Sequence, residues 1–445
     1  MSLLGAMNTA ISGLTAQSAA FGNISDNVAN SQTTGYKEVE TNFVDYLTNS
    51  TATVNDPGAV VAQPDYLNNV QGTITQVTNP LALAIAGQGF FAVSQETGVQ
   101  NGVPSFNPQQ FYSRAGDFTL NSAGYLVNSA GEYLNGWSVD PASGIVNENS
   151  LAPIQVTQTV YNPVATTGVT LSANLPATPA TGTATAASPI SSDIDVYDAL
   201  GTQHVITLNW VQTSANNWSV QINCPDSATP DCGTADVSFG PNASGDAIAP
   251  SGTIGNLATD GTDPGSVTIP NAPADGAAAD VTFTADFGNG IQTITLNLGN
   301  FGGTNGVTQY AGTEYNLEGL TQNGVPPGSF AGVTPQANGD IVVNYNNGQS
   351  RTIAQVPLVT FNDPNALQRQ DGQSFTATTA SGTPLANAAS TNGAGNLVTG
   401  SVESSNVDIA TEFSNLIVAQ QAYSANAKMV TTAQQMLETT VDMKQ

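Results

Sequence analysis

Both ends of this chain carry apolar residues in a repeat of three and four positions, a pattern that constrains the fold more than any other feature of the sequence. Such a repeat places apolar side chains along one side of a helix. The N-terminal repeat runs through Leu4, Met7, Ile11, Leu14, Ser18, Phe21, Ser25 and Val28. The C-terminal repeat runs through Ile409, Phe413, Leu416, Gln420, Tyr423, Ala427, Val430, Gln434, Leu437 and Val441. The sequence therefore predicts an amphipathic helix at each end.

Local signals support both helices but also indicate that they need partners. Asp408 can accept backbone N–H groups at the start of the second helix, and no Pro or Gly follows Val402. Gly5, Gly13 and Gly22 each weaken the first helix by about 1 kcal/mol. Burial of the apolar seams offsets only part of the entropy lost when about 60 residues are ordered. We expect ordered helices where each seam finds a neighbour; the alternative is that both pack on the chain's own core.

The long segment between the two ends has the pattern of β-structure. Short alternating or apolar runs, such as Val205–Trp210 and Ile291–Leu298, are separated by Gly, Asn and Asp. Asn346-Asn-Gly348 joins two strand-like runs and predicts a hairpin. We therefore expect a mainly β fold with α-helical termini, in which nested β domains are carried on a terminal coiled coil.

Changes in composition indicate where the domains begin and end. Two segments mark the boundaries of a domain inserted into a first β domain. The chain passes out of the first β domain through a Thr-, Ala-, Ser- and Pro-rich stretch at 165–192, and it re-enters that domain at Asn323-Gly-Val-Pro-Pro-Gly328. The predicted parts are terminal helices at 1–30 and 404–445, an extended linker at 31–79 and 399–403, a first β domain at 80–164 and 327–398, and an inserted outer β domain at 165–326.

The charge balance excludes several classes of partner. The 445 residues hold 6 Lys and Arg against 33 Asp and Glu, a net charge of −27, and only 9% of residues are charged. Six cations cannot follow a phosphate backbone or hold an anionic membrane surface, so we expect no nucleic acid and no membrane partner. The most apolar run, Leu81–Ala86, is far shorter than the ~20 residues of a membrane helix. No basic signal-peptide start precedes Lys37, so we expect a cytosolic chain or export without a cleaved signal.

Few residues are available for catalysis or metal binding, and we expect no catalytic residue, no metal and no cofactor. His204 has Asp198 nearby but no nucleophile motif, so a structural or surface role is favoured. The acidic run Asp193–Asp198 lacks the Gly and distal Glu of a calcium loop. Cys224 and Cys232 bracket a short loop, which suits a local disulfide if this segment lies outside the cell.

The termini resemble the paired signatures of the flagellar axial protein family, which contains rod, hook and junction proteins. The N-terminal likeness rests on Ile11-Ser-Gly-Leu-Thr-Ala16, Ile24-Ser-Asp-Asn-Val-Ala-Asn30 and Thr34-Gly-Tyr-Lys37, and the C-terminal likeness on Ser405-Asn-Val-Asp408 and Tyr423-Ser-Ala-Asn-Ala-Lys428. The signature residues carried over are Asn27, Asn30, Thr34, Gly35, Tyr36, Lys37, Asn406, Asp408, Asn426 and Lys428. Gln421 stands where the family often has Arg, and Phe21 where it often has Leu.

Internal motifs are most similar to the hook branch of this family. Gly87-Gln-Gly-Phe-Phe91 and Tyr112-Ser-Arg-Ala-Gly-Asp-Phe118 look like its first β domain. Asp198-Ala-Leu-Gly-Thr-Gln-His204 and Leu358-Val-Thr-Phe-Asn-Asp-Pro364 resemble hook-type segments. Phe43 and Leu47 match the aromatic–x–x–x–apolar export signal of early substrates, for which the alternative is a half-buried linker strand.

The resemblance implies a structural, non-enzymatic subunit. It implies a helical homopolymer that forms a curved, flexible tube between rod and filament and transmits torque as a universal joint. The terminal helices would form the inner tube, and the subunit would be exported through the flagellar channel to the extracellular hook. Implied partners are other copies of the chain, the distal rod, the hook cap, the hook–filament junction protein and the type III export gate. The alternatives are another axial component, such as a distal rod protein, or a secreted β-rich adhesin.

Overall fold

The chain divides into two compact units, each described here by itself. The computed structural model describes residues 3–50, 55–100, 103–140, 143–179, 184–241, 249–259 and 267–442, without the side chains of 3–4, 48–50, 55–57 and 441–442. The side chains of Leu4 and Val441 in the predicted seams thus lie outside the described residues. Unit 1 comprises Met1–Gln158, Ala331–Asn344 and Ser350–Gln445, and unit 2 comprises Thr159–Phe330 and Tyr345–Gln349.

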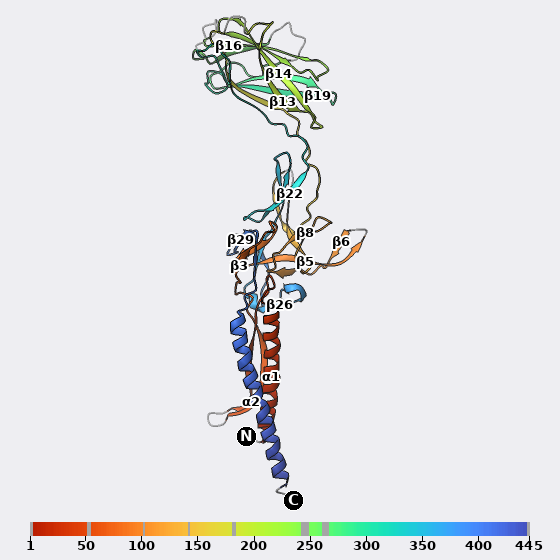
Figure 1. Ribbon diagram of the computed structural model, residues 1–445. Coiled ribbons are helices and arrows are strands. Elements are labelled where there is room, and N and C mark those ends of the chain that lie inside the picture. The colour runs from red at the N-terminus through yellow and green to blue at the C-terminus, as the bar shows by residue number, and fades with distance from the viewer. Residues whose placement is uncertain are drawn as a thin grey trace. The chain divides into compact units, whose positions relative to one another are not determined.

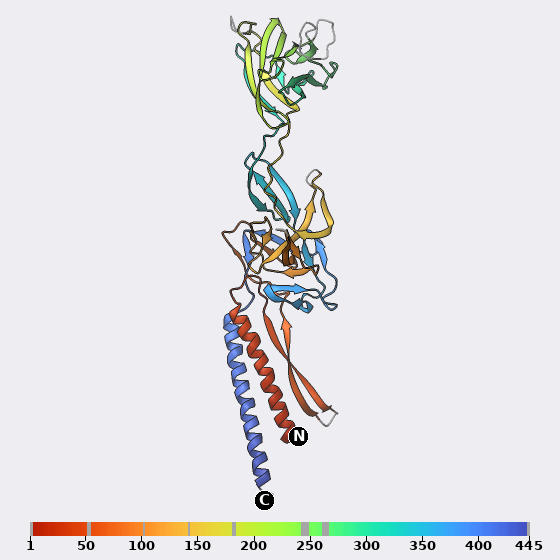
Figure 2. The same ribbon diagram turned by 90° about the vertical axis from the view of Figure 1, so that its right-hand side faces the viewer.

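Helices α1 (Leu3–Ala29) and α2 (Ile409–Asp442) lie side by side in unit 1 (Figures 1 and 2). Asp408 caps α2, because its Oδ1 accepts the backbone N–H groups of Ala410 at 2.8 Å and Thr411 at 3.2 Å. After α1 the chain turns at Gly35, whose φ is +71°. A Cβ at Gly35 would overlap the backbone of Ala115, so only glycine fits this turn.

A long antiparallel hairpin accompanies α1 (Figure 2). It is formed by β1 (Val39–Ser50) and β2 (Asn55–Tyr66), with Val39 paired to Tyr66 at its base. The backbone N–H of Val60 donates to Oγ of Ser12 at 3.0 Å, which ties the hairpin to α1. The segment 31–79, expected to be an extended linker, therefore contains a hairpin that folds back along the first helix.

The rest of unit 1 is a β-body whose strands come from both halves of the chain. Its main sheet follows the order β22-β23-β24-β10-β5-β7-β27-β26. Phe91, Leu134 and Leu358 are fully buried in its core. The hairpin predicted at Asn346-Asn-Gly348 is confirmed, because β23 and β24 pair antiparallel around it.

The strands and 3-10 turns of this body are β3 (Ile74–Gln76), β4 (Leu83–Ala86), β5 (Phe90–Gln100), β6 (Val103–Phe106), β7 (Phe111–Ser113), β8 (Thr119–Leu120), β9 (Leu126–Val127), β10 (Glu132–Val139), β11 (Val146–Pro153), β22 (Phe330–Pro335), β23 (Asp340–Tyr345), β24 (Ser350–Gln355), β25 (Leu358–Thr360), η1 (Pro364–Ala366), β26 (Gln368–Arg369), η2 (Asp371–Gln373), β27 (Ser374–Thr376), β28 (Leu385–Asn387), β29 (Asn396–Thr399) and β30 (Ser401–Glu403). Two short pairings, β4 with β29 and β3 with β30, join segments from opposite ends of the sequence.

Unit 2 is built from two sheets that share one apolar core. The first is an antiparallel meander in the order β13-β14-β15-β16-β17, and the second has the order β18-β19-β12-β20 with β21 beside β12. Trp210, Trp218 and Phe283 lie fully buried between them. A mainly β fold with N- and C-terminal helices packed together was expected, and this fold class is confirmed.

The strands of unit 2 are β12 (Gly168–Asn174), β13 (Ile190–Tyr197), β14 (Gln203–Ser214), β15 (Asn217–Asn223), β16 (Asp231–Phe239), β17 (Ile254–Thr259), β18 (Ala278–Asp286), β19 (Ile291–Asn300), β20 (Val307–Thr308) and β21 (Asn316–Gln322).

Candidate assembly surface and polar junction

The buried sides of α1 and α2 carry small residues. The small buried residues are Ala10, Ala16, Ala20, Ala419 and Ala433, and the larger Ile24, Asn27 and Glu412 are buried as well. A methyl group at Gly13 would lie 2.8 Å from Nδ2 of Asn426, so the helices approach closely at that level. Phe21 and Tyr423 provide the large contact, with ring centroids 6.2 Å apart in an edge-to-face arrangement. Small side chains therefore make up most of the buried residues of the two helices, and most large apolar side chains of α2 are not buried.

Large apolar side chains of α2 remain exposed on both flanks of its buried side. A helix turns about 100° per residue, which separates these side chains into two groups. The Phe413 strip consists of Ile409, Phe413 and Ile417, and Phe413 is 53% exposed. The Val418 strip consists of Val418, Met429 and Met436, and Val418 is 65% exposed. Exposed apolar groups in such rows are typical of surfaces that bind another protein.

The predicted seam residues occupy several different environments. Met7, Leu14, Phe21 and Val28 of α1 are half-buried, and Ile11 is exposed. Leu416, Val430 and Leu437 of α2 are half-buried, whereas Ile409, Phe413 and Tyr423 are exposed. Phe43 and Leu47, predicted as an export signal, lie on β1 with exposed side chains. The seams are thus only partly covered within one chain.

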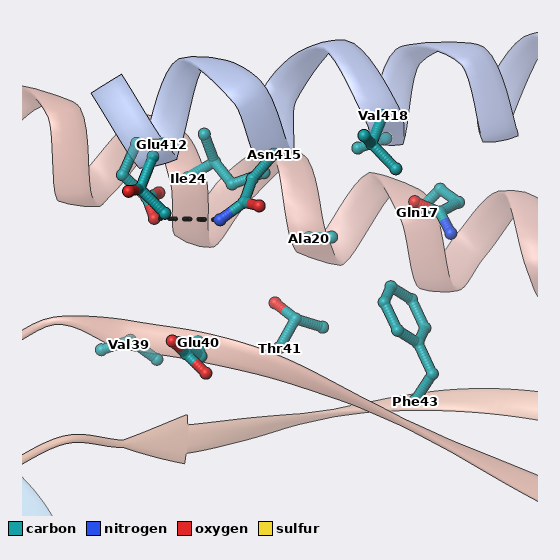
Figure 3. Close-up of a pocket in the computed structure, with 12 residues that line it drawn as sticks. Gln17, Ala20, Ile24, Val39, Glu40, Thr41, Phe43, Glu412, Asn415 and Val418 are labelled. Atoms are coloured by element: carbon teal, nitrogen blue, oxygen red, sulfur yellow. Dashed lines mark hydrogen bonds between the residues drawn. The ribbon is translucent and has the colours of Figure 1, made fainter. Parts of the chain in front are cut away.

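A groove of about 390 Å³ lies between α1, α2 and β1 (Figure 3). Its walls combine apolar side chains such as Ile24, Phe43 and Val418 with the polar Gln17 and Asn415. Glu412 closes one end and accepts a hydrogen bond from Asn415 at 3.5 Å. The groove is large enough for a side chain from another molecule.

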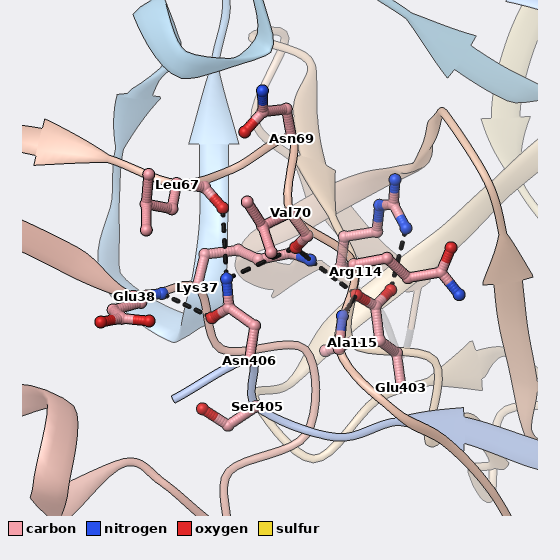
Figure 4. A network of polar contacts seen from close by, with 12 residues as sticks. Lys37, Glu38, Leu67, Asn69, Val70, Arg114, Ala115, Glu403, Ser405 and Asn406 are labelled. Atoms are coloured by element: carbon pink, nitrogen blue, oxygen red, sulfur yellow. Dashed lines mark hydrogen bonds and ion pairs between the residues drawn. The ribbon is translucent and has the colours of Figure 1, made fainter. Parts of the chain in front are cut away.

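Where the helices meet the β-body, one buried carboxylate binds two cations (Figure 4). Glu403 lies 2.6 Å from Nζ of Lys37 and 2.9 Å from Nη1 of Arg114, and all three side chains are almost completely buried. The backbone N–H of Gly72 also donates to Glu403, at 2.9 Å. Burial lowers the pKa of Lys37, while the Glu403 carboxylate opposes that shift. This ion cluster links β30 near the C-terminus to segments more than 280 residues earlier.

Two signature asparagines complete this polar junction. Asn406 accepts the N–H of Glu38 at 2.7 Å and donates to the carbonyls of Leu67 at 3.3 Å and Val70 at 3.4 Å (Figure 4). Asn27, at the end of α1, donates to the Val39 carbonyl at 3.0 Å and to Glu412 at 3.2 Å. Asn27 also accepts the hydroxyl of Tyr36 and the N–H of Val39, both at 3.1 Å. The asparagines thus fix how both helices leave the β-body.

Two carboxyl groups share this junction. Glu38 hydrogen-bonds to Glu412, which is buried beside Asn27. Burial and the nearby Glu412 charge raise the pKa of Glu38 to about 7, with Glu40 and Asp408 adding to the shift. The pair therefore holds a proton in the physiological pH range.

The remaining signature residues lie close by or on α2. Tyr36 is buried under the guanidinium of Arg369, whose Cζ is 4.4 Å from the ring centroid, and burial raises its pKa. Asn30 donates to the Asp26 carbonyl at 2.9 Å and Thr34 is half-buried. Asn426 faces Gly13, and Lys428 is exposed.

Sequence reasoning singled out Lys37, Asn27 and Asn406 but not Glu403, Arg114 and Glu412 as site residues. The signal that could have found them is the scarcity of charge. With only six cations in the chain, a cation within an apolar strand pattern, such as Arg114 beside Phe111 and Tyr112, needs a buried acid. The sequence does not indicate which acid that is.

In unit 2, the predicted structural residues lie inside or beside the core. The ring of His204 stacks on Phe287 with centroids 4.1 Å apart, and its Nδ1 lies 3.1 Å from Asp226. Cys224 and Cys232 are both buried and hold free thiols. Among the residues that the structure describes, no group of three or more His, Cys, Asp or Glu is placed to hold a metal ion. Neither helix, over its described length, is long and apolar enough to span a membrane.

Comparison with family models finds four matches along the chain. Residues 7–37 match the model of flagella basal body rod protein, and 398–443 match flagellar basal body rod FlgEFG protein C-terminal. Residues 84–174 match the flagellar hook protein FlgE/F/G D1 domain, and 170–325 match the flagellar basal body protein FlaE D2 domain.

Full-length relatives are also found. The chain is 30% identical over 445 residues to the flagellar hook protein FlgE of Brucella suis, covering 100% of both. It is 30% identical over 449 residues to the flagellar hook protein FlgE of Salmonella typhimurium, covering 98% of this chain and 99% of the relative. Among solved structures, the flagellar hook protein FlgE2 of Helicobacter pylori matches with a TM-score of 0.45 and 14% identity, covering 73% of this chain and 98% of that one.

Proposed function

This chain belongs to the flagellar hook protein FlgE family and is a non-enzymatic subunit of the extracellular hook, and from this we propose that α1 and α2 form the inner core of the hook tube. In that core they pack against the same helices of neighbouring copies. The proposed tube uses the division of the chain predicted above. The terminal helices at 1–30 and 404–445 form the inner core, the linker at 31–79 and 399–403 follows, and the β domains form the layers outside it.

The observation that carries the proposal is the pair of exposed apolar strips on α2. The Phe413 strip and the Val418 strip lie on opposite flanks of the α1-facing side. One chain buries neither of them, although burying a large apolar side chain contributes about 1.5–3 kcal/mol. Neighbours on both flanks would cover both strips, as a closed ring of helices requires.

The groove in Figure 3 supports the same assembly. It opens between α1, α2 and β1, and Val418 belongs both to its wall and to the Val418 strip. A large apolar side chain of a second copy would fill it and displace water from Ile24 and Phe43. The groove and the strip would therefore form one continuous contact.

The β domains, 80–164 with 327–398 and the inserted 165–326, form the outer layers in this proposal. Within the described residues, the ion pairs involve Lys37, Arg114 and, when it is protonated, His204, and the first two are buried. Outer surfaces with few charge pairs have many packings of similar energy. Such surfaces suit a curved, flexible tube that transmits torque as a universal joint.

The partners beyond the chain itself follow from the same assignment. We propose contacts with the distal rod, the hook cap and the hook–filament junction protein at the ends of the polymer. We also propose that Phe43 and Leu47 are read by the type III export gate before folding. Both lie exposed on β1, so their replacement would leave the folded core intact.

A pair of charge-matched variants tests the inner core. Phe413→Asp places a charge on the Phe413 strip, and Gln421→Asp places the same charge on an exposed polar position between the two strips, on the side of α2 that faces away from Ala419. Purified variants are examined by circular dichroism and, after salting-out with ammonium sulfate, by negative-stain microscopy. We expect both to fold as wild type and only Phe413→Asp to fail to form tubes. Normal tubes from Phe413→Asp would contradict the proposal.

A further inference from the structure

Unit 2 buries two thiols side by side at the closed end of one hairpin. Cys224 follows β15 directly and Cys232 is the second residue of β16. Their exposed fractions are 0% and 1%, and both belong to the core shared by the two sheets. The loop between them, 225–231, connects the two strands.

A bulge in β16 turns the second cysteine toward the first. Alternation along β16 points Ala235, Val237 and Phe239 into the core, so Cys232, three positions before Ala235, would face outward. Ile222 pairs with Gly233 but Asn223 pairs with Asp231, which leaves Cys232 as the extra residue of a bulge. Gly233 has a φ of +116°, a conformation that favours glycine. The bulge therefore brings Cys232 to the buried side, where Cys224 already lies.

Local contacts hold the thiols together. The Cys224 thiol hydrogen-bonds to Cys232, and the backbone N–H of Cys224 donates to the Pro230 carbonyl at 2.7 Å. That thiol hydrogen bond lowers the pKa of Cys232 and, together with burial, raises the pKa of Cys224. Among the described residues, the two cysteines belong to no group of three or more His, Cys, Asp or Glu that could hold a metal ion.

We propose that Cys224 and Cys232 form an intramolecular disulfide in the extracellular hook and close the 225–231 loop. Outside the cell, where this family functions, disulfides persist. The oxidant is a small-molecule disulfide. The thiolate of one cysteine attacks one of its sulfurs and releases the first small thiol, and the other cysteine then attacks the protein sulfur of this mixed disulfide and releases the second.

In the balanced reaction, a protein dithiol and a small disulfide become a protein disulfide and two small thiols. Two electrons pass from the cysteine sulfurs to the small disulfide. Because both cysteine sulfurs are buried in the folded unit, the bond forms while the sheets assemble and is protected afterwards.

The test uses the full chain refolded with either oxidised or reduced glutathione. Each sample is denatured without reductant, treated with iodoacetamide and analysed by peptide mass spectrometry. Refolding with oxidised glutathione should give a peptide pair lighter by two hydrogen atoms with neither cysteine alkylated. Cys224→Ser and Cys232→Ser serve as matched controls, and the remaining thiol of each should be alkylated.

Stability supplies a second measurement. The oxidised wild type should melt roughly 5–10 °C above its reduced form in unit 2, and neither Ser variant should respond to the oxidant. The proposal is overturned if both wild-type thiols stay alkylatable after oxidative refolding. It is also overturned if the disulfide joins two chains or if glutathione remains attached to the wild type.

Discussion

Glu403 illustrates how one side chain can hold together distant parts of a chain that has few charges. Its carboxylate faces Lys37 and Arg114, and none of the three is open to solvent. The attraction offsets the cost of removing the charges from water only while all partners are present. The cluster is therefore most sensitive to substitution of Glu403, the acid that both cations share.

Replacing that acid should weaken unit 1 strongly. Glu403→Gln leaves two buried cations without a counter-charge, and we expect a loss of about 3–5 kcal/mol in the free energy of opening. Hydrogen exchange with mass spectrometry would measure it at β3 and β30, independently of unit 2. Glu148→Gln, at an exposed position on β11, is the control and should change the value by less than about 0.5 kcal/mol. Equal protection in both variants would show that the ion cluster is dispensable.

Glu38 gives the junction a pH dependence with a definite sign. Its pKa is raised from 4.5 to about 7 in the folded chain, mainly by burial and then by Glu412. The folded state therefore keeps a proton that the unfolded state loses, so stability falls as pH rises from about 4.5 to about 7 and then levels off. Glu38→Gln cannot ionise and should lose less stability between about pH 5 and about pH 8 than wild type. Thermal melts at both pH values test this, and identical losses would refute it.

Single residues also mark how far sequence reasoning reaches at the junction. Asn27, Lys37 and Asn406 could be selected because their motifs resemble a family signature. Their partners could not, because Lys37 and Glu403 are 366 positions apart and the fold alone brings them together. The Glu38–Glu412 pair was likewise missed, since two acids in contact run against the usual pairing of opposite charges.

At the scale of an element, α2 has one face that is buried within the chain and two exposed apolar strips that are proposed to contact other copies. The apolar repeat predicted the helix and a seam through Ile409 and Phe413 that needs a neighbour. Within one chain, the buried residues in the described part of α2 are Glu412, Ala419 and Ala433. An apolar repeat indicates that one face of a helix must be buried, but it does not indicate which helix packs against that face. Small residues allow α1 to come close, and the large ones remain for the neighbours proposed above.

Two glycines of α1 test the close approach of the helices. Gly22 has open space around the Cβ position, so Gly22→Ala should stabilise the helix by about 1 kcal/mol. At Gly13 the added methyl would press on Nδ2 of Asn426 at 2.8 Å, so Gly13→Ala should gain less or lose stability. Thermal melts followed by circular dichroism compare the two. Equal gains would mean that the helices do not touch at Gly13 in solution.

For the whole molecule, charge governs assembly. Each copy carries −27, and a polymer brings these charges within reach of one another. The Debye length is about 8 Å at physiological salt, so added salt screens the repulsion. Polymerisation should strengthen with sodium chloride and more with sulfate, which also favours apolar burial. Sedimentation of polymer across a salt series measures this, and polymers that are more stable in low salt would contradict it.

The pairing of β3 with β30 and of β4 with β29 also determines the order of folding. A chain delivered N-terminus first presents all of unit 2 before the strands that complete unit 1 exist. Until residue 403 arrives, β3 and β4 keep unpaired edges, and open edges are sites where other chains attach. The last fifty or so residues therefore complete the fold as well as carrying α2. A chain interrupted shortly before Asn396 would be expected to aggregate with unit 2 already folded.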